Sequence, residues 1–180
     1  LSPDTIFSDV CSLKTFVSKK KRPYKFIPSH PMAGTEHQGF ENSMSGLFKG
    51  KKWVITPVFG EDGTLIDIIR ELGAEPIITT PEKHDEAAAL ISHMPMLIAQ
   101  AIFKTAEDNE LALQMASSGF RDMTRLAMSN VEMANDMVLM NSENIQTSIL
   151  KLYKSIGDLT NSNYLSQIKE IKSKRQTMFL

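Results

Sequence analysis

The stretch Pro76-Ile77-Ile78-Thr79-Thr80-Pro81-Glu82 separates two kinds of sequence in this chain. Its first half is a short apolar run of the kind that forms a strand. Its second half is a helix start, in which Thr80 is placed to cap the helix and Pro81 takes the first helical position, where no N–H is needed. The residues before and after this stretch therefore require separate interpretation.

Residues 1–80 alternate short apolar runs with helical or loop segments. The expected strands cover residues 5–10, 24–27, 52–56 and 76–80, and the expected helices cover residues 12–20 and 62–72. Gly73 closes the second helix, because glycine readily adopts the left-handed conformation in which many helices end. Strands that alternate with helices are typical of an α/β sheet with parallel members. We therefore predict an α/β domain over residues 1–80.

Residues 81–180 show helical periodicity throughout, with few glycines or prolines and no strand-like alternation. One apolar stripe keeps i, i+4, i+7 spacing over about four turns, and its members are Ile145, Ile149, Leu152, Ile156 and Leu159. The methionines of these helices are interpreted as core or subunit-interface side chains rather than as metal ligands. We therefore predict an all-α domain over residues 81–180.

Composition argues against several classes of protein. The net charge is −1, and the one basic run, residues 19–22, is interpreted as a solvated helix end, so binding to nucleic acid or to an anionic membrane is not expected. The single cysteine, Cys11, excludes an internal disulfide and fits a reducing cytoplasm. No apolar run is seen that approaches the roughly 18 residues of a membrane span, so no transmembrane helix is expected.

The pattern of glycines is informative because of a motif that it lacks. No two of the nine glycines are separated by a single residue, so the sequence contains no Gly-x-Gly-x-x-Gly phosphate cradle. The chain also opens on Leu1 without a methionine. We expect it to be a piece of a longer protein, whose phosphate-binding segment would precede residue 1.

Candidate chemistry is concentrated in His30-Pro31-Met32-Ala33-Gly34-Thr35-Glu36, directly after the predicted strand 24–27. Packing alone does not require an imidazole, a proline, a glycine and a carboxylate in one short stretch. Proline and glycine favour a loop here, and open α/β sheets bind ligands at the edge where such loops leave the strands. We therefore predict that His30 lies in a loop at the mouth of the sheet. The structural alternative is a loop histidine whose ring is satisfied by the backbone.

Five separated motifs between residue 5 and about residue 145 resemble the prephenate/arogenate dehydrogenase family of tyrosine biosynthesis. They are Asp9-Val10-Cys11-Ser12-Leu13-Lys14, Ser29-His30-Pro31-Met32-Ala33-Gly34-Thr35-Glu36, His84-Asp85, Ser92-His93-Met94-Pro95 and Gly119-Phe120-Arg121-Asp122-Met123-Thr124-Arg125. The resemblance implies that residues 1–80 are the C-terminal part of a Rossmann-type NAD(P)-binding domain. It implies that residues 81–180 are an all-helical substrate-binding and dimerisation domain, and that the protein is a homodimer.

The resemblance also implies a reaction, the oxidative decarboxylation of prephenate to 4-hydroxyphenylpyruvate. A hydride leaves the carbinol carbon of the substrate ring for NAD or NADP, the ring carboxylate departs as CO₂, and the ring becomes aromatic. Such chemistry needs a group that takes the hydroxyl proton, and a neutral histidine suits this task because its pKa lies near the operating pH.

The resemblance carries roles over to seven residues. His30 matches the catalytic histidine that polarises the ring hydroxyl. Ser12 matches a catalytic serine that hydrogen-bonds this hydroxyl and the histidine, and it is also assigned to the cofactor. The substrate-binding assignments are Thr35, Glu36, His84, His93 and Arg125. Without the resemblance, Ser12 would be interpreted as a helix N-cap and Arg125 as part of a solvated helix face.

His84 and His93 raise a geometric question. Nine residues of a straight helix turn through about 900°, which places the two rings on opposite faces. Pro95 is expected to kink the helix near Ile91. We predict that His93 faces the substrate cleft and that His84 lies near the domain junction. No zinc site is expected, because the four histidines lack the spacing of metal ligands.

Two departures from the family pattern leave the substrate open. Met96 stands where many members have histidine, and Ser129-Asn130-Val131-Glu132-Met133-Ala134 stands where they often have Ser-Asp-Pro-x-x-Trp. Prephenate, arogenate or both therefore remain as substrates, and NAD or NADP as cofactor.

Two other interpretations remain beside the enzyme. One is a non-catalytic helical dimer that the sheet remnant only caps, and the other is a different hydroxyacid dehydrogenase on the same two-domain plan. On the enzyme interpretation the complete protein turns over prephenate, whereas this 180-residue chain alone is expected to be inactive.

Overall fold

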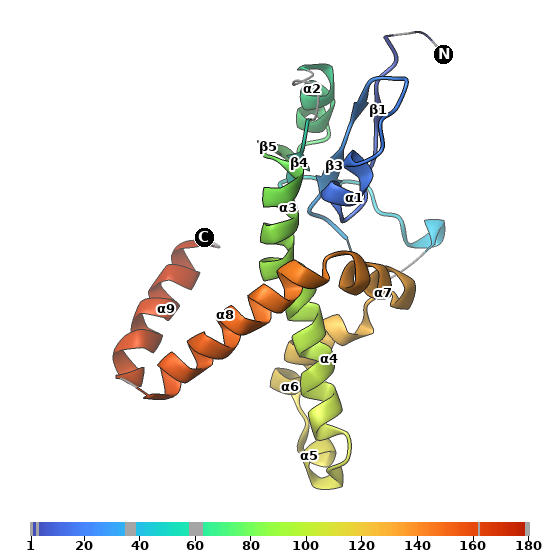
Figure 1. Ribbon diagram of the computed structural model, residues 1–180. Helices are drawn as coiled ribbons and strands as arrows, with labels where there is room; N and C mark the ends of the chain where they lie inside the picture. The colour runs from blue at the N-terminus through green and yellow to red at the C-terminus, as the bar shows by residue number, and fades with distance from the viewer. Residues whose placement is uncertain (1, 3, 35–38, 58–62, 162, 179–180) are drawn as a thin grey trace. The chain divides into compact units, whose positions relative to one another are not determined.

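The computed structural model describes residues 2, 4–34, 39–57, 63–161 and 163–178 (Figure 1). The chain forms two compact units, Leu1–Ile145 and Gln146–Leu180, and each is described by itself. The first unit holds the predicted α/β region together with more than half of the predicted helical region. The unit boundary therefore differs from the domain boundary expected at residue 80, because helix α3, just after that boundary, packs against α1.

The strands of the first unit form two small sheets. β1 (Phe7–Ser8) pairs in parallel with β2 (Phe26–Ile27). In the second sheet, β4 (Lys52–Ile55) lies between β3 (Ser29–Pro31), which runs antiparallel to it, and β5 (Glu75–Ile78), which runs parallel. β1, β2 and β4 fall inside ranges predicted from the sequence, and β5 overlaps the predicted 76–80.

β3 was not predicted, and it changes the setting of His30. The sequence placed this histidine in a loop, whereas the structure places it on β3, opposite Val54 of β4. The pairing continues past the strand, since the Met32 amide donates to the Lys52 carbonyl at 2.8 Å. Pro31 is tolerated because β3 lies at the edge of this three-stranded sheet, where a missing N–H breaks no ladder.

A small apolar core lies between the sheet and helix α2 (Gly63–Glu71). Its buried members are Ile27, Trp53, Ile55, Leu65, Ile69 and Ala74. Gly73 closes the helix as predicted, with a φ of 76° that other residues adopt only under strain.

Ten helical segments follow the strands or lie between them among the described residues of the chain. They are α1 (Lys14–Ser18), α2, α3 (Pro81–Ala88), a π-helical turn (Ala89–His93), α4 (Met94–Ala106), α5 (Glu110–Met115), α6 (Ser118–Thr124), α7 (Val131–Met140), α8 (Ser142–Asn161) and α9 (Tyr164–Met178), besides 3₁₀ turns at Phe40–Asn42 and Arg125–Met128. The predicted helix start is confirmed, since the Thr80 side chain accepts a hydrogen bond from the Lys83 amide at 3.3 Å.

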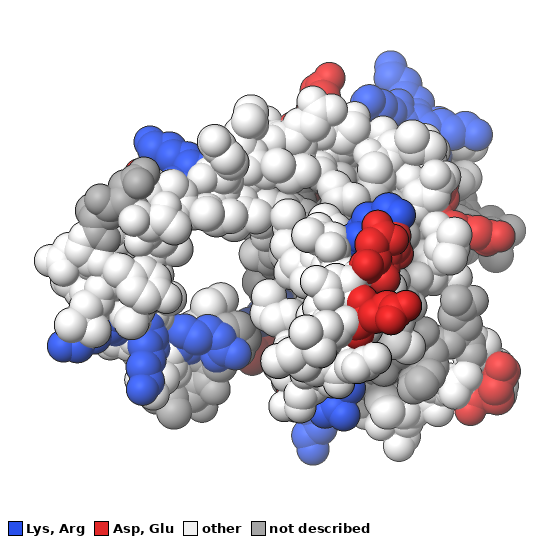
Figure 2. Space-filling view, turned by 90° about the horizontal axis from the view of Figure 1, so that it is seen from below, with Lys and Arg blue, Asp and Glu red and all other residues white. Residues whose placement is uncertain are grey.

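The basic run 19–22 follows α1 directly. Lys19 caps the helix, and the Arg22 guanidinium donates to the Val17 carbonyl at 2.7 Å and lies 3.7 Å from the centre of the Phe26 ring. The prediction of a solvated helix end is confirmed for this run. On the face shown in Figure 2, basic side chains form small separate groups with acidic ones between some of them, and most of the face carries neither.

The predicted helix interruption near Ile91 is present as the π-helical turn Ala89–His93. Pro95 explains its position, because proline has no N–H to offer the carbonyl four residues earlier and its ring crowds that carbonyl. The stretch Pro81–Ala106 that contains the turn is long and apolar enough to cross a membrane by length and composition alone, contrary to the expectation that no run would qualify. His84, Asp85 and His93 of this stretch are buried and hydrogen-bonded within the protein, although only 28% of its apolar window is buried.

The second unit consists of most of α8 followed by α9. Several large apolar side chains in it are exposed: Leu150, Tyr153, Ile156, Tyr164, Leu165, Ile171 and Met178. The helix predicted around the apolar stripe is therefore present, and Ile156 of that stripe is half exposed in the single chain.

Two neighbouring isoleucines of α2 provide a test of the core. Ile69 is fully buried, so Ile69→Ala should lower the free energy of unfolding by about 2–5 kcal/mol through lost burial and the cavity left behind. Ile68 is half exposed on the same helix, so Ile68→Ala should cost clearly less. Denaturant unfolding of the complete protein measures both, and equal losses would contradict this packing of α2.

Candidate active site

A cavity of about 700 Å³ opens beside the C-terminal end of β3 in the first unit. One side is formed by Ser12, by His30 and by the residues that follow it to Gly34. The rest of the lining comes from the helical region and includes Met96 and Arg125. The stretch that the sequence analysis marked for chemistry therefore faces a helical wall.

The ring of His30 is anchored through one nitrogen. Its Nδ1 lies 2.9 Å from Nε2 of His84. Burial, together with the nearby His84, Lys14 and His93, lowers the pKa of His30 to about 4. At neutral pH the ring is therefore uncharged, which is the protonation state that a proton acceptor requires.

His84 is held from behind by Asp85. His84 Nδ1 lies 2.8 Å from the Asp85 carboxylate, which also accepts the backbone amides of Lys14 at 2.8 Å and Thr15 at 2.9 Å. Burial alone would raise the pKa of Asp85, but the hydrogen bonds from His84, Lys14 and Thr15 outweigh it and lower the pKa, so the carboxylate is ionised at neutral pH.

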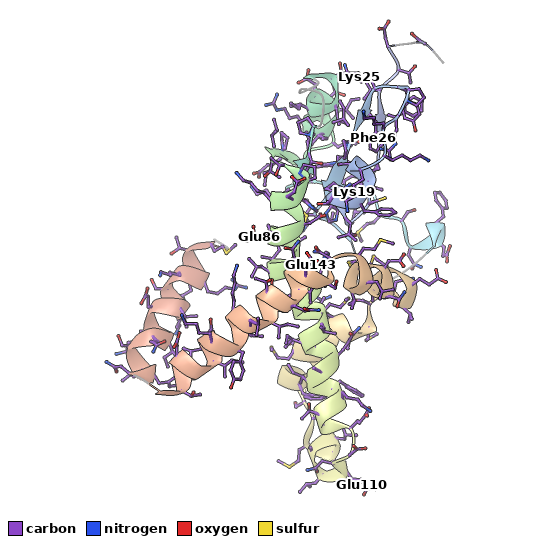
Figure 3. The ribbon with its side chains drawn as sticks, in the orientation of Figure 1. Lys19, Lys25, Phe26, Glu86, Glu110 and Glu143 are labelled. Carbon is purple, nitrogen blue, oxygen red and sulfur yellow. The ribbon has the colours of Figure 1, made fainter. Side chains whose placement is uncertain are left out.

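The Asp85 carboxylate also replaces a cap that helix α1 lacks. Leu13 occupies the N-cap position and offers no side-chain acceptor, so the first amides of α1 depend on Asp85 of α3. Figure 3 shows the two helices, with Lys19 at the end of α1 and Glu86 on α3, and they are in contact. Ser12 is therefore not the N-cap that its position suggested; it precedes the capped turn and lines the cavity.

A buried ion pair fixes α1 to β3. The Lys14 ammonium lies 2.5 Å from the Asp9 carboxylate and donates to the Ser29 carbonyl, while the other Asp9 oxygen accepts the Ser29 amide at 3.0 Å. Lys14 is fully buried, and burial lowers its pKa. The strand that carries His30 is thus tied to the segment that carries Ser12.

Three of the seven predicted site residues line the cavity: Ser12 and His30 on one side and Arg125 on the other. Arg125 begins the 3₁₀ turn after α6. Thr35 and Glu36 lie outside the described residues. The fold thus brings a hydroxyl, an imidazole and a guanidinium from segments far apart in the chain to one cavity.

His84 and His93 do not line this cavity. Both are buried; His84 lies behind His30, and His93 Nδ1 lies 3.1 Å from the side-chain amide of Asn141. His93 was expected to face the cleft, but the π-helical turn and Asn141 hold it inside the protein. His84 was expected near the domain junction, and it contacts both regions because it lies on α3 and bonds β3.

Sequence reasoning gave no role to Asp85, Lys14 or Asn141. Asp85 and Lys14 lie within the quoted motifs, so their closeness in sequence to His84 and Ser12 was the signal that could have marked them. Asn141 donates to the Asp85 carbonyl at 2.9 Å as well as contacting His93, and no local pattern marks it.

Two family models match this chain. A model of the prephenate dehydrogenase nucleotide-binding domain matches residues 1–78, and a model of the prephenate dehydrogenase dimerization domain matches residues 80–172. The chain belongs to the prephenate dehydrogenase family. The predicted fold class, part of a Rossmann-type domain followed by a helical domain, is confirmed by these matches and by the structure.

Three individual proteins illustrate the similarity. Prephenate dehydrogenase of Bacillus subtilis is 31% identical over 130 residues, which cover 68% of this chain and 35% of that protein. The structure of Aquifex aeolicus prephenate dehydrogenase in complex with hydroxyphenyl propionate and NAD⁺ aligns with a TM-score of 0.79 at 28% identity, covering 99% of this chain and 68% of the other. Synechocystis arogenate dehydrogenase aligns with a TM-score of 0.71 at 30% identity, covering 98% and 68%. This chain thus spans about a third of the Bacillus relative.

The buried ion pair of this family member is open to a direct test. Lys14→Met leaves the Asp9 carboxylate, whose side chain is 14% exposed, without its cation, and should lower the free energy of unfolding by about 3–5 kcal/mol. Lys52→Met removes a half-exposed pair with Glu75 and should cost at most about 1 kcal/mol. Similar losses in denaturant unfolding of the two variants would contradict the assignment of Lys14.

The low pKa of His30 predicts a pH dependence of stability. The unfolded histidine titrates near pH 6.5 and the folded one near 4, so the unfolded state binds more protons between these values. The contribution of His30 is present above pH 6.5 and is lost as the pH falls toward 4. His30→Asn should therefore flatten the rise of the free energy of unfolding with pH across this window. An unchanged slope would contradict the assignment.

Proposed function

We propose that the protein containing this chain catalyses the oxidative decarboxylation of prephenate to 4-hydroxyphenylpyruvate with NAD⁺. The observation that carries the proposal is a neutral, anchored His30 in the same cavity as Arg125. Family membership supports it, as does the similarity to a relative whose structure holds hydroxyphenyl propionate and NAD⁺.

We assign His30 as the group that takes the proton from the ring hydroxyl as the hydride leaves. Ser12 hydrogen-bonds the hydroxyl, and Arg125 binds a substrate carboxylate, for which a planar guanidinium has matching geometry. Thr35 and Glu36 keep their assignment as substrate-binding residues in this proposal, and His84 and His93 support the site from behind the cavity wall.

The cofactor assigned to this protein is NAD⁺, with NADP⁺ as the alternative. When bound, it supplies the hydride acceptor. Of the described residues, Ser12 is the one assigned to it, because its hydroxyl lines the cavity that holds His30. The sequence carries no Gly-x-Gly-x-x-Gly, so the phosphates require residues that are not in this sequence.

Arogenate is the second candidate substrate. Its support is the similarity to an arogenate dehydrogenase that is 30% identical to this chain. We also propose a cytoplasmic homodimer that forms through the helical region, because α8 and α9 carry exposed apolar side chains and the matching family model is a dimerization domain. No nucleic acid or membrane partner is proposed.

The activity is tested by mixing the complete protein with prephenate and NAD⁺ and following NADH absorbance and CO₂ release. Both should rise together, and the same assay with arogenate and with NADP⁺ ranks the alternatives. The 180-residue chain alone should be inactive, since it lacks the phosphate cradle. Inactivity of the complete protein on both substrates would favour a non-catalytic helical dimer.

His30→Asn tests the proposed proton acceptor. The substitution removes the basic nitrogen, and kcat should fall by at least about 100-fold, within the usual contribution of general base catalysis. The circular dichroism spectrum should be unchanged. Full activity of a folded His30→Asn protein would make His30 a structural histidine.

A further inference from the structure

The hydrogen bonds around Asp85 determine where the protons of two histidines sit. An ionised carboxylate can only accept hydrogen bonds, so the contact at 2.8 Å requires His84 to carry a proton on Nδ1. A neutral His84 then has an unprotonated Nε2. Because this Nε2 lies 2.9 Å from Nδ1 of His30, it accepts the proton that His30 carries there.

The consequence for His30 is a fixed tautomer. With its proton on Nδ1, the remaining nitrogen, Nε2, holds a free lone pair, and the residue lines the cavity. Asp85 sets the direction of these hydrogen bonds. It contacts His84, and His84 in turn contacts His30. Neither His84 nor Asp85 lines the cavity among the residues that the structure describes there.

We propose that His84 and Asp85 form a positioning pair, which fixes Nε2 of His30 as the proton acceptor and shares the charge when His30 is protonated. The proposal rests on the proposed function and extends it behind the cavity wall. The substrate hydroxyl proton moves to Nε2 of His30, the Nδ1 proton of His30 moves to Nε2 of His84, and the resulting imidazolium of His84 is paired with the Asp85 carboxylate. No net charge is created by the second transfer.

Sharing the proton with His84 compensates for the low pKa of His30. Burial, His84, Lys14 and His93 together lower the pKa of His30 to about 4, so a proton held on His30 alone is disfavoured at neutral pH. Asp9 acts in the opposite direction on the same ring. His84, unlike His30, has a carboxylate in hydrogen-bond contact with its ring, 2.8 Å from its Nδ1.

Contacts from α1 and from Asn141 hold the pair in place. The Asp85 carboxylate accepts the first amides of α1, and the Asp85 carbonyl accepts the side-chain amide of Asn141, at the end of α7. The orientation of the Asn141 amide is fixed because its oxygen accepts from Asn144 at 2.8 Å. The same NH₂ group contacts Nδ1 of His93, which ties the π-helical turn to α3.

Two substitutions of His84 in the complete protein separate the two parts of the proposal. In His84→Gln the side-chain oxygen still accepts the Nδ1 proton of His30 but takes up no proton, so kcat for prephenate should fall by about tenfold. In His84→Leu the acceptor is gone, and kcat should fall by about 100-fold or more. The KM for prephenate should change less than about threefold in both. Lys83→Gln, on the adjacent exposed position, is the control and should match the parent protein.

Equal losses in the Gln and Leu variants, or parent-like kcat in a folded His84→Leu protein, would overturn the proposal. Asp85→Asn is expected to weaken the α1 cap as well, so its kinetics are interpreted only alongside its unfolding curve. Nitrogen NMR of the histidine rings provides a readout that needs no turnover. His30, assigned through the signals lost in His30→Asn, should be protonated on Nδ1; a proton on Nε2 would overturn the proposal. An inactive parent protein with the expected tautomer would instead count against the proposed function.

Discussion

The Asp85 carboxylate is the interaction on which the site of this prephenate dehydrogenase family member depends. It is a buried, acceptor-only group that meets three donors, one from the ring of His84 and two from the first turn of α1. The contact to Lys14 joins residues 71 positions apart in the chain. A single carboxylate therefore fixes the helix that follows Ser12 and the ring behind His30 at the same time, so these two cavity residues share one anchor.

Much of the fold could be predicted from local signals. Thr80 and Pro81 indicate a helix start, and Gly73 indicates a helix end. The apolar runs around Val54 and Ile77 indicate two strands. Each of these signals acts within a few residues. β3 could not be predicted in this way. Its three residues form a strand only because β4 supplies an antiparallel partner, and Pro31 hides that pairing from any local pattern. The compact units differ from the expected boundary for a similar reason, since α3 packs on α1 across it.

The site was predictable where motifs marked it. His30 was marked by the residues around it, Ser12 and Arg125 by resemblance to a family, and all three line one cavity. The positions of His84 and His93 depend instead on tertiary contacts, with His30 and with Asn141, and helical periodicity carries no information on such contacts. Asn141 illustrates the limit well, because it lies at a helix junction and its role exists only once α3 and the π-helical turn are packed beside it.

The π-helical turn Ala89–His93 affects which side chains of α4 line the cavity. Each residue added to or removed from a helix rotates everything after it by about 100°. The five residues of the turn therefore set which side chains of α4 face the cavity, and in this chain Met96 is one of them. A relative with one residue fewer in this turn would present a different side chain at that place with no substitution in α4. Rotational register, as well as side-chain identity, thus decides which α4 side chain lines the cavity that His30 shares.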